Sequence, residues 1–310
     1  MSIRALYEVP APAKLNLHLH VVGRRADGYH LLDSTMVLID WADTLHFEAR
    51  SDARLLRHDL GAALPDDDLS LRAARALQQA SGSSLGVDLS IDKRVPWGAG
   101  LGGGSSDAAS TLLALNRLWR LDWPLERLLR IGLGLGADVP FFLAGANARV
   151  GGIGERLAPL RVASAWYAVL KPAASLDTRS VFASARVAEA VEAARIAGFS
   201  EASFGAPHGA PQVPREDDPD LALGAGRNDL QAAAEDLCPD VARAAALLRE
   251  AFGNSRMTGS GSAVFARVGQ ASKGSMPPAE MPDDAPLGWS GRMCRSLERH
   301  PLADWARHGG

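Results

Sequence analysis

Residues 96–106 read Pro96-Trp97-Gly98-Ala99-Gly100-Leu101-Gly102-Gly103-Gly104-Ser105-Ser106, and this stretch decides the fold. Five glycines in the seven positions 98–104 let the backbone turn sharply and bring its N–H groups within bonding distance of an anion. The alternating pattern of 87–91 predicts a strand before the loop, and an apolar-faced helix is expected over 107–119. Ser105, Ser106 and Asp107 are helix-capping residue types. We therefore expect the loop to end at a helix N-terminus, where unpaired N–H groups favour phosphate.

Other kinds of glycine-rich loop fit this stretch less well. No Lys-Ser or Lys-Thr pair follows the glycines, so the Walker pattern of P-loop NTPases is absent. Gly98, Gly100 and Gly103 have the spacing of a dinucleotide-binding loop, which requires an acidic residue at the end of a second strand. Asp122 stands at about the right distance, but no strand pattern precedes it. A flexible linker is disfavoured because linkers rarely join a strand to a capped helix.

The composition is that of an ordinary globular protein. The chain has 310 residues, enough for two domains, with 47% apolar and 22% charged residues. A net charge of −3 gives no reason to expect a nucleic acid or an anionic membrane as a partner. The two cysteines, Cys238 and Cys294, lack the spacing of a metal site or a disulfide framework. With no signal-peptide pattern or membrane-spanning run, we expect a cytoplasmic protein.

A strand is predicted over residues 14–21, where apolar and polar residues alternate. Its polar face carries Lys14, Asn16, His18 and His20. Isolated histidines are usually structural or solvated. A half-buried strand whose polar face is exposed to solvent therefore explains much of this pattern. Lys14 and Asn16 are better candidates for function, because nearby prolines place the start of the strand at the mouth of a loop.

Two later features present a choice between structural and functional roles. Gly28 follows an aspartate and predicts a tight hairpin turn, after which Tyr29 and His30 either pack or face a ligand. Asp138 is a lone acid among apolar residues, directly before Val139. It is either the N-cap of a short helix or a poorly solvated carboxylate suited to proton transfer or metal binding. The residues themselves leave these alternatives open.

The second half of the chain combines regular segments with polar ones. An alanine-rich helix is predicted over 179–197, and a surface insertion over 198–226, where Gly, Pro and acidic residues dominate. Residues 256–266 predict strand, glycine turn and strand, which is either a plain hairpin or a second small-residue loop beside the nucleotide. The four prolines of 269–286 predict another flexible segment.

Three blocks in this order resemble the GHMP small-molecule kinases, which include galactokinases, homoserine kinases and mevalonate kinases. They are Pro10-Ala11-Pro12-Ala13-Lys14-Leu15-Asn16-Leu17, the glycine loop continued by Asp107-Ala108-Ala109, and Thr258-Gly259-Ser260-Gly261-Ser262. Three more resemble the branch that phosphorylates a cytidine diphosphate sugar alcohol in isoprenoid precursor synthesis: Arg24–His30, Leu135–Pro140 and Arg227–Leu230. The combination covers nearly the whole chain and is far more specific than any single block.

The resemblance implies an α+β fold of two domains with a deep cleft between them. Residues 1–160 would form an ATP-binding domain that resembles ribosomal protein S5, and residues 161–310 a ferredoxin-like domain. The implied reaction transfers a phosphoryl group from ATP, with Mg²⁺, to the 2-hydroxyl of the cytidine diphosphate sugar alcohol. The ATP phosphates would lie on Pro96–Ser106. No nucleic acid or membrane partner is implied, and neither the oligomeric state nor a Mg²⁺ ligand follows from the resemblance.

The resemblance also implies roles for two ionisable residues. Asp138 matches the general base of the family, and Lys14 matches its partner lysine. Phosphoryl transfer to an alcohol requires an acceptor for the hydroxyl proton and positive charge near the reacting oxygens, which this pair would supply. A neighbouring lysine also keeps the carboxylate ionised.

The resemblance also implies which residues contact the two substrates. Asn16 matches a substrate contact, and the cytidine pocket is matched by Tyr29, His30 and Phe182. Lys93 matches a position near the nucleotide. The family usually has Asp-Asn-Leu where this chain has Asp67-Asp68-Leu69, which predicts an altered contact near the adenine.

Two alternatives to this branch remain. A mevalonate or homoserine kinase would keep the glycine loop but lack the Gly28-Tyr29-His30 block. A nucleotide-binding protein without catalytic activity is disfavoured by the presence of both Lys14 and Asp138.

Overall fold

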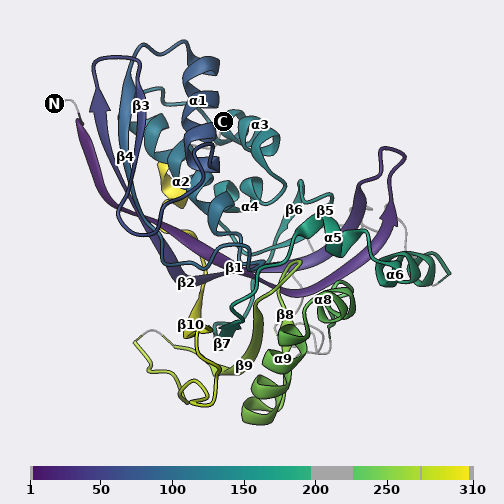
Figure 1. Ribbon diagram of the computed structural model, residues 1–310. Helices are drawn as coiled ribbons and strands as arrows, with labels where there is room; N and C mark the ends of the chain where they lie inside the picture. The colour runs from purple at the N-terminus through teal and green to yellow at the C-terminus, as the bar shows by residue number, and fades with distance from the viewer. Residues whose placement is uncertain (1–2, 197–225, 273, 307–310) are drawn as a thin grey trace.

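The computed structural model describes residues 3–196, 226–272 and 274–306. Two long antiparallel strands, β1 (Ala5–Arg24) and β2 (His30–Arg50), run through the centre and connect the two parts of the molecule (Figure 1). The strand predicted over 14–21 is thus the middle of a longer strand. Its pairing with β2 is irregular at several points, so the hairpin bends as it passes from one part to the other.

The turn between β1 and β2 is the predicted Asp-Gly turn. Gly28 has a φ of 92°, which favours glycine. The Asp27 side chain accepts a hydrogen bond from the Tyr29 N–H at 3.2 Å and so stabilises the turn from within. Tyr29 and His30 follow directly, at the start of β2.

The first part of the molecule is a sheet with helices on one face (Figure 1). Besides β1 and β2 it contains β3 (Leu55–Asp59), β4 (Gly86–Asp92), β5 (Ala148–Gly152), β6 (Arg156–Pro159), α1 (Leu69–Ser81), α2 (Gly103–Leu118), α3 (Leu125–Leu135) and α4 (Val139–Ala144). β4 pairs antiparallel with β2 and parallel with β3, and β5 pairs with another section of β2. The predicted strand over 87–91 is confirmed. Leu112 and Phe47 belong to the apolar core between α2 and the sheet.

The second part is a smaller sheet packed against helices. It contains β7 (Ala165–Lys171), α5 (Thr178–Phe182), α6 (Ala185–Ile196), α8 (Gln231–Leu237), α9 (Pro239–Phe252), β8 (Arg256–Met257), β9 (Val264–Gln270) and β10 (Ser290–Leu297). After β10 the chain returns to the first part, where the 3₁₀ helix η2 (Ala303–Trp305) packs against the core beside α2. The strand order β10-β7-β9-β8 joins the first sheet through β10, which also pairs with β2. Apolar side chains of α8 and α9 form a core with β7 and β9. The predicted α+β fold is confirmed, and the domain boundary at residue 160 stays a prediction.

Helix α2 begins four residues earlier than predicted. Gly102 is its N-cap residue with a φ of 72°, and the predicted side-chain capping is wrong, because Ser105, Ser106 and Asp107 lie inside the helix. A side chain at Gly102 would be strained, and its Cβ would lie 2.9 Å from the Phe142 ring. Glycine is therefore required at the junction, and the glycine loop itself contributes the first helical turn.

The helix predicted over 179–197 is two separate helices, α5 and α6. The Asp177 side chain caps α5 by accepting the Ser180 N–H at 2.9 Å, and the Ser184 hydroxyl accepts the Arg186 N–H at 3.3 Å where α6 begins. Each helix thus has its own capping residue. The insertion predicted over 198–226 lies, apart from Gly226, outside the described residues. Between 271 and 289, the described residues form neither helix nor strand.

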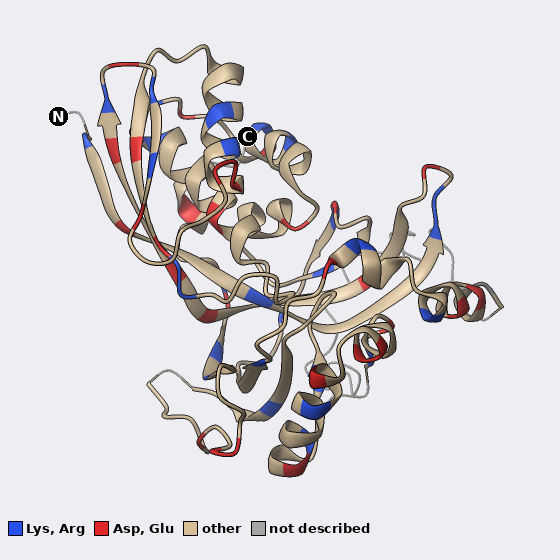
Figure 2. Ribbon diagram, in the orientation of Figure 1, with Lys and Arg blue, Asp and Glu red and all other residues tan. Residues whose placement is uncertain are grey.

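Charged residues are interspersed over both parts of the molecule (Figure 2). Among the described helices, none has the length and apolar character needed to cross a bilayer.

Candidate active site

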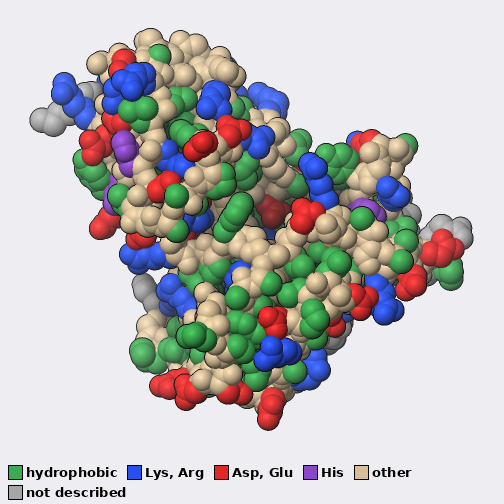
Figure 3. Space-filling model, in the orientation of Figure 1, with side chains coloured by type: hydrophobic (Ala, Val, Ile, Leu, Met, Phe, Trp, Pro, Cys, Tyr) green, Lys and Arg blue, Asp and Glu red, His purple; other side chains and the backbone are tan. Residues whose placement is uncertain are grey.

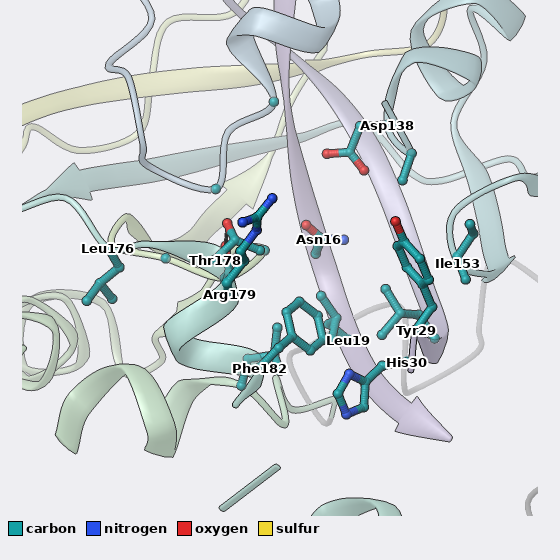
Figure 4. Close-up of a pocket in the computed structure, with 18 of the residues that line it drawn as sticks. Asn16, Leu19, Tyr29, His30, Asp138, Ile153, Leu176, Thr178, Arg179 and Phe182 are labelled. Atoms are coloured by element: carbon teal, nitrogen blue, oxygen red, sulfur yellow. Dashed lines mark hydrogen bonds between the residues drawn. The ribbon is translucent and has the colours of Figure 1, made fainter. Parts of the chain in front are cut away.

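A cavity of about 790 Å³ lies where the two parts of the molecule meet, and the space-filling view shows the surface hollowed there (Figure 3). Side chains and glycines from both parts line it. The predicted site residues among them are Lys14, Asn16, Tyr29, His30, Gly98, Gly100, Gly102, Ser105, Asp138 and Phe182. One cavity therefore brings together the phosphate-loop, catalytic and cytidine-binding residues expected from the sequence (Figure 4).

The phosphate loop alternates between glycines that line the cavity and apolar residues that anchor it. Gly98, Gly100 and Gly102 have φ values of 63°, 73° and 72°, a conformation that favours glycine. Ala99 and Leu101 are buried in the core between the two sheets. The seven predicted loop residues that do not line the cavity are Pro96, Trp97, Ala99, Leu101, Gly103, Gly104 and Ser106.

The loop is fixed by backbone contacts to both parts of the molecule. The Lys14 N–H donates to the Leu101 carbonyl at 3.0 Å, and the Ala263 N–H donates to the Ala99 carbonyl at 3.1 Å. Beyond the loop, the first turn of α2 has N–H groups without helical partners, and Ser105 of this turn lines the cavity. The loop and the helix terminus therefore present donors to an anion in the cavity.

Lys14, Asn16 and Asp138 form a polar group at the loop end of the cavity. The Lys14 ammonium lies 3.7 Å from the Asp138 carboxylate and donates to the Asn16 side-chain oxygen at 2.5 Å. Lys14 is only 2% exposed, and burial lowers the pKa of its ammonium, with the Asp138 charge acting in the opposite direction. The Asn16 amide also donates to the Ser34 hydroxyl at 2.8 Å, which holds Asn16 in place.

Asp138 occupies the N-cap position of α4, but its side chain makes no capping hydrogen bond. Capping by the side chain is therefore wrong as an explanation of this residue. The carboxylate is 30% exposed, and Figure 4 shows it pointing into the cavity. It can contact both the Lys14 ammonium and a bound molecule.

An aromatic group lines the opposite end of the cavity. The rings of His30 and Phe182 stack on each other with centroids 5.1 Å apart, and Tyr29, which is 62% exposed, lies across the cavity from Phe182 (Figure 4). Burial lowers the pKa of His30, and the nearby Arg24 charge lowers it further. A neutral imidazole has one donor and one acceptor nitrogen, as hydrogen bonding to the edge of a base requires.

The segment between β8 and β9 is both a hairpin and part of the cavity wall. Gly259, Ser260 and Gly261 line the cavity. A Cβ on Gly100 would lie 2.1 Å from the Thr258 carbonyl oxygen, so the phosphate loop packs directly against this turn. The Asn228 side-chain amide donates to the Met257 and Gly259 carbonyls, each at 2.8 Å. The Arg227–Leu230 block thereby holds the second loop in position.

Lys93 lies between two buried acidic side chains behind the phosphate loop. Its ammonium contacts Asp43 and lies 2.8 Å from Asp107. The other Asp43 oxygen accepts the N–H groups of Arg94 and Val95 at 2.6 and 2.8 Å. This group ties the residues before the loop to the helix after it, and a nucleotide contact by Lys93 stays a prediction.

Several residues that line the cavity were not singled out from the sequence. They include Leu19, Ile153, Leu176, Thr178 and Arg179. Arg179 had one usable signal, because it precedes Phe182 by three residues and so shares its helical face.

The sequence was compared with known families and proteins. Residues 68–146 match the model of the GHMP kinase N-terminal domain, and residues 211–275 match that of the C-terminal domain. A 4-diphosphocytidyl-2-C-methyl-D-erythritol kinase of Methylibium petroleiphilum is 58% identical over 99% of this chain and 100% of its own length. Another, from Verminephrobacter eiseniae, is 52% identical over 98% of this chain and 99% of its own. The chain belongs to this family of GHMP kinases.

Solved structures agree with the family assignment. A crystal structure of a 4-(cytidine 5'-diphospho)-2C-methyl-D-erythritol kinase is 33% identical, with a TM-score of 0.64, and covers 86% of this chain and 90% of its own. A homoserine kinase from Cytophaga hutchinsonii has a TM-score of 0.63 at 14% identity, over 96% of this chain and 95% of its own, which shows the shared fold.

Proposed function

We propose that this protein transfers the γ-phosphoryl group of ATP to the 2-hydroxyl of 4-diphosphocytidyl-2-C-methyl-D-erythritol, in the synthesis of isoprenoid precursors. One observation supports the proposal above all others. A single cavity has an ammonium–carboxylate pair at its phosphate-loop end and three aromatic side chains at the other. Its two ends therefore match the reacting group and the base of a cytidine diphosphate alcohol.

The reaction assigns different tasks to Asp138 and Lys14. Asp138 accepts the hydroxyl proton as the oxygen forms its bond to the γ-phosphorus, and the bond from phosphorus to the bridging oxygen of ADP breaks. Lys14, 3.7 Å from Asp138, provides positive charge beside the transferring phosphoryl group. The N–H groups of the loop and of α2 hold the ATP phosphates. No covalent bond to the enzyme forms.

Mg²⁺ is part of the proposal. No group of three metal-ligating side chains occurs among the residues that the structure describes. Such a group is not required, because Mg²⁺ in kinases is held by one or two side chains together with phosphate oxygens and water. Ser105, an oxygen-bearing side chain of the loop that lines the cavity, would hold it. When bound, the ion neutralises charge on the phosphates.

The substrate would span the cavity, with its base among Tyr29, His30 and Phe182 and its alcohol beside Asn16 and Asp138. A cytoplasmic enzyme is also part of the proposal, since the buried thiols of Cys238 and Cys294 are free, as a reducing compartment favours.

The experiment is an ADP-release assay with ATP, Mg²⁺ and a panel of alcohols. The panel contains the cytidine diphosphate alcohol, its uridine analogue, mevalonate and homoserine. We expect ADP formation and a new phosphate monoester, detected by phosphorus NMR, with the cytidine compound alone. Product formation only with mevalonate or homoserine would overturn the proposal.

A further inference from the structure

Arg179 lines the cavity but has no task in the proposed chemistry. It is an exposed residue of α5, and no hydrogen bond or ion pair joins its side chain to another of the described residues. Figure 4 shows its guanidinium directed across the cavity toward Asn16 rather than away from the protein. The Arg179 charge helps to lower the pKa of the nearby Asp177 carboxyl. Since the guanidinium makes no hydrogen bond to that carboxylate, its donors stay available, and a cation of this kind on the wall of a binding cavity suggests an anionic group in the ligand.

The position of Arg179 along the cavity is set by α5. Phe182 follows three residues later on the same helical face and stacks on His30 at the base end. At the other end of α5, the Thr178 hydroxyl lies 2.9 Å from the Ser260 hydroxyl, in the turn that packs against the phosphate loop. Arg179 therefore stands between the base end and the reacting end of the cavity.

The other charged residues that line the cavity are already engaged. Lys14 lies beside Asp138, and Asp27 pairs with Arg25 at 2.8 Å. Arg24 donates to the Gly28 carbonyl at 3.2 Å, which ties it to the hairpin turn. Among the described residues of the cavity wall, Arg179 is thus the cation whose side chain makes no hydrogen bond to the protein.

We propose that Arg179 binds the diphosphate of the acceptor substrate. This inference rests on the proposed function, because in a cytidine diphosphate alcohol the diphosphate lies between the base and the hydroxyl that reacts. A ligand stacked on Phe182 with its hydroxyl at Asp138 brings its phosphates past Arg179. The planar guanidinium suits two phosphate oxygens at once, which fixes the distance from the base to the reacting hydroxyl.

The test measures whether Arg179 recognises phosphate specifically. Binding of CDP and of cytidine is measured by calorimetry, with a non-hydrolysable ATP analogue at saturation so that CDP cannot occupy the phosphate loop. Arg179→Gln should raise the Kd of CDP roughly 10- to 100-fold, as for the loss of a charged hydrogen-bonding partner, and that of cytidine less than about twofold. Arg179→Lys should raise the Kd of CDP by a smaller factor than Arg179→Gln does. Lysine keeps the positive charge but cannot donate two parallel hydrogen bonds to one phosphate group.

Arg186→Gln is the matched control. Arg186 is an exposed arginine of the neighbouring helix α6, paired with Asp236 at 3.1 Å and outside the cavity. Its variant should bind CDP as the wild type does. An equal loss in this control would mean a general charge effect and would overturn the proposal.

Three other results would also overturn it. Equal losses of CDP and cytidine would mean that Arg179 only supports Phe182. If Arg24→Gln raised the Kd of CDP and Arg179→Gln did not, Arg24 would be the residue that binds the phosphates. If Arg179→Gln raised only the KM for ATP, Arg179 would bind ATP rather than the acceptor substrate. Failure of the proposed function is a separate result, because it would appear as a wild-type enzyme that phosphorylates no cytidine diphosphate alcohol.

Discussion

Replacing Asp138 by asparagine tests the chemistry most directly. The substitution keeps the size and shape of the side chain but removes its charge and most of its ability to accept a proton. Asp138 makes no capping bond to α4 and is 30% exposed, so the fold should be little affected. The change is therefore confined to the reacting end of the cavity.

The expected loss follows from the geometry around Asp138. A positioned general base contributes roughly 10²- to 10⁴-fold to the rate, so kcat of Asp138→Asn should fall by about that factor, or about 3 to 5 kcal/mol. The variant also removes the charge 3.7 Å from the buried Lys14 ammonium. At that distance the gross attraction is on the order of 4 kcal/mol at an intermediate dielectric, less after solvent screening. Burial should then lower the pKa of Lys14 further in the variant than in the wild type.

The assay compares single-turnover rates and nucleotide binding in the same preparations. The affinity for ATP should stay within about threefold of that of the wild type, because the substitution leaves the phosphate loop unchanged. Asp240→Asn is the control, since Asp240 is a carboxylate of α9 outside the cavity that pairs with Arg243 at 2.9 Å. A kcat of Asp138→Asn close to that of the control would refute the general-base role. A large loss of ATP affinity at unchanged kcat would assign Asp138 to nucleotide binding instead.

Three further predictions test the cytidine site, the packing of the glycine loop and the buried acid Asp107. Phe182→Ala should raise KM for the cytidine substrate about 5- to 150-fold, as for loss of a stacked base, with KM for ATP unchanged; parallel losses would mean a structural role. Gly100→Ala should lower the midpoint of urea unfolding, because its Cβ would lie 2.1 Å from the Thr258 carbonyl, whereas Gly104→Ala, whose nearest atom is 3.7 Å away, should not. Burial raises the pKa of Asp107 to about 8, so its contribution to stability is present below pH 4 and is lost as the pH rises toward 8. The urea midpoint of Asp107→Asn should vary less between pH 5 and 8 than that of the wild type; identical pH profiles would contradict the raised pKa.

The parts of the structure that sequence analysis predicted correctly have local signals. The glycine loop, the Asp-Gly turn and the alternating strand each depend on neighbours within a few residues, and the structure confirms their backbone conformations, whereas phosphate binding by the loop stays a prediction. The order of the blocks then placed Lys14 and Asp138 in one site, although 124 positions separate them in the sequence. The structure brings them to 3.7 Å.

The errors occurred where tertiary packing overrides local preference. Glycine disfavours helix, so α2 was predicted to begin at Asp107 rather than Gly103. A Cβ at Gly103 would lie 3.1 Å from the Val95 side chain, which is tighter than ordinary contact, so glycine packs against the segment before the loop without displacing it. The early start of α2 is thus a consequence of close packing between the two ends of the loop.

Asp68 shows why the charge of a site cannot be read from local sequence. An aspartate where the family usually has asparagine predicts extra negative charge near the adenine. In the structure Asp68 caps α1 through the N–H groups of Ser70 and Leu71 at 3.1 and 3.2 Å. Arg57, on the neighbouring strand β3, donates to the same carboxylate at 2.8 Å. Arg57 also pairs with Asp59 at 2.7 Å, so the added charge is partly balanced by a cation that two carboxylates share. Because this pairing depends on how β3 packs against α1, only the folded chain reveals that Asp68 caps a helix and binds Arg57, and an altered contact near the adenine stays a prediction.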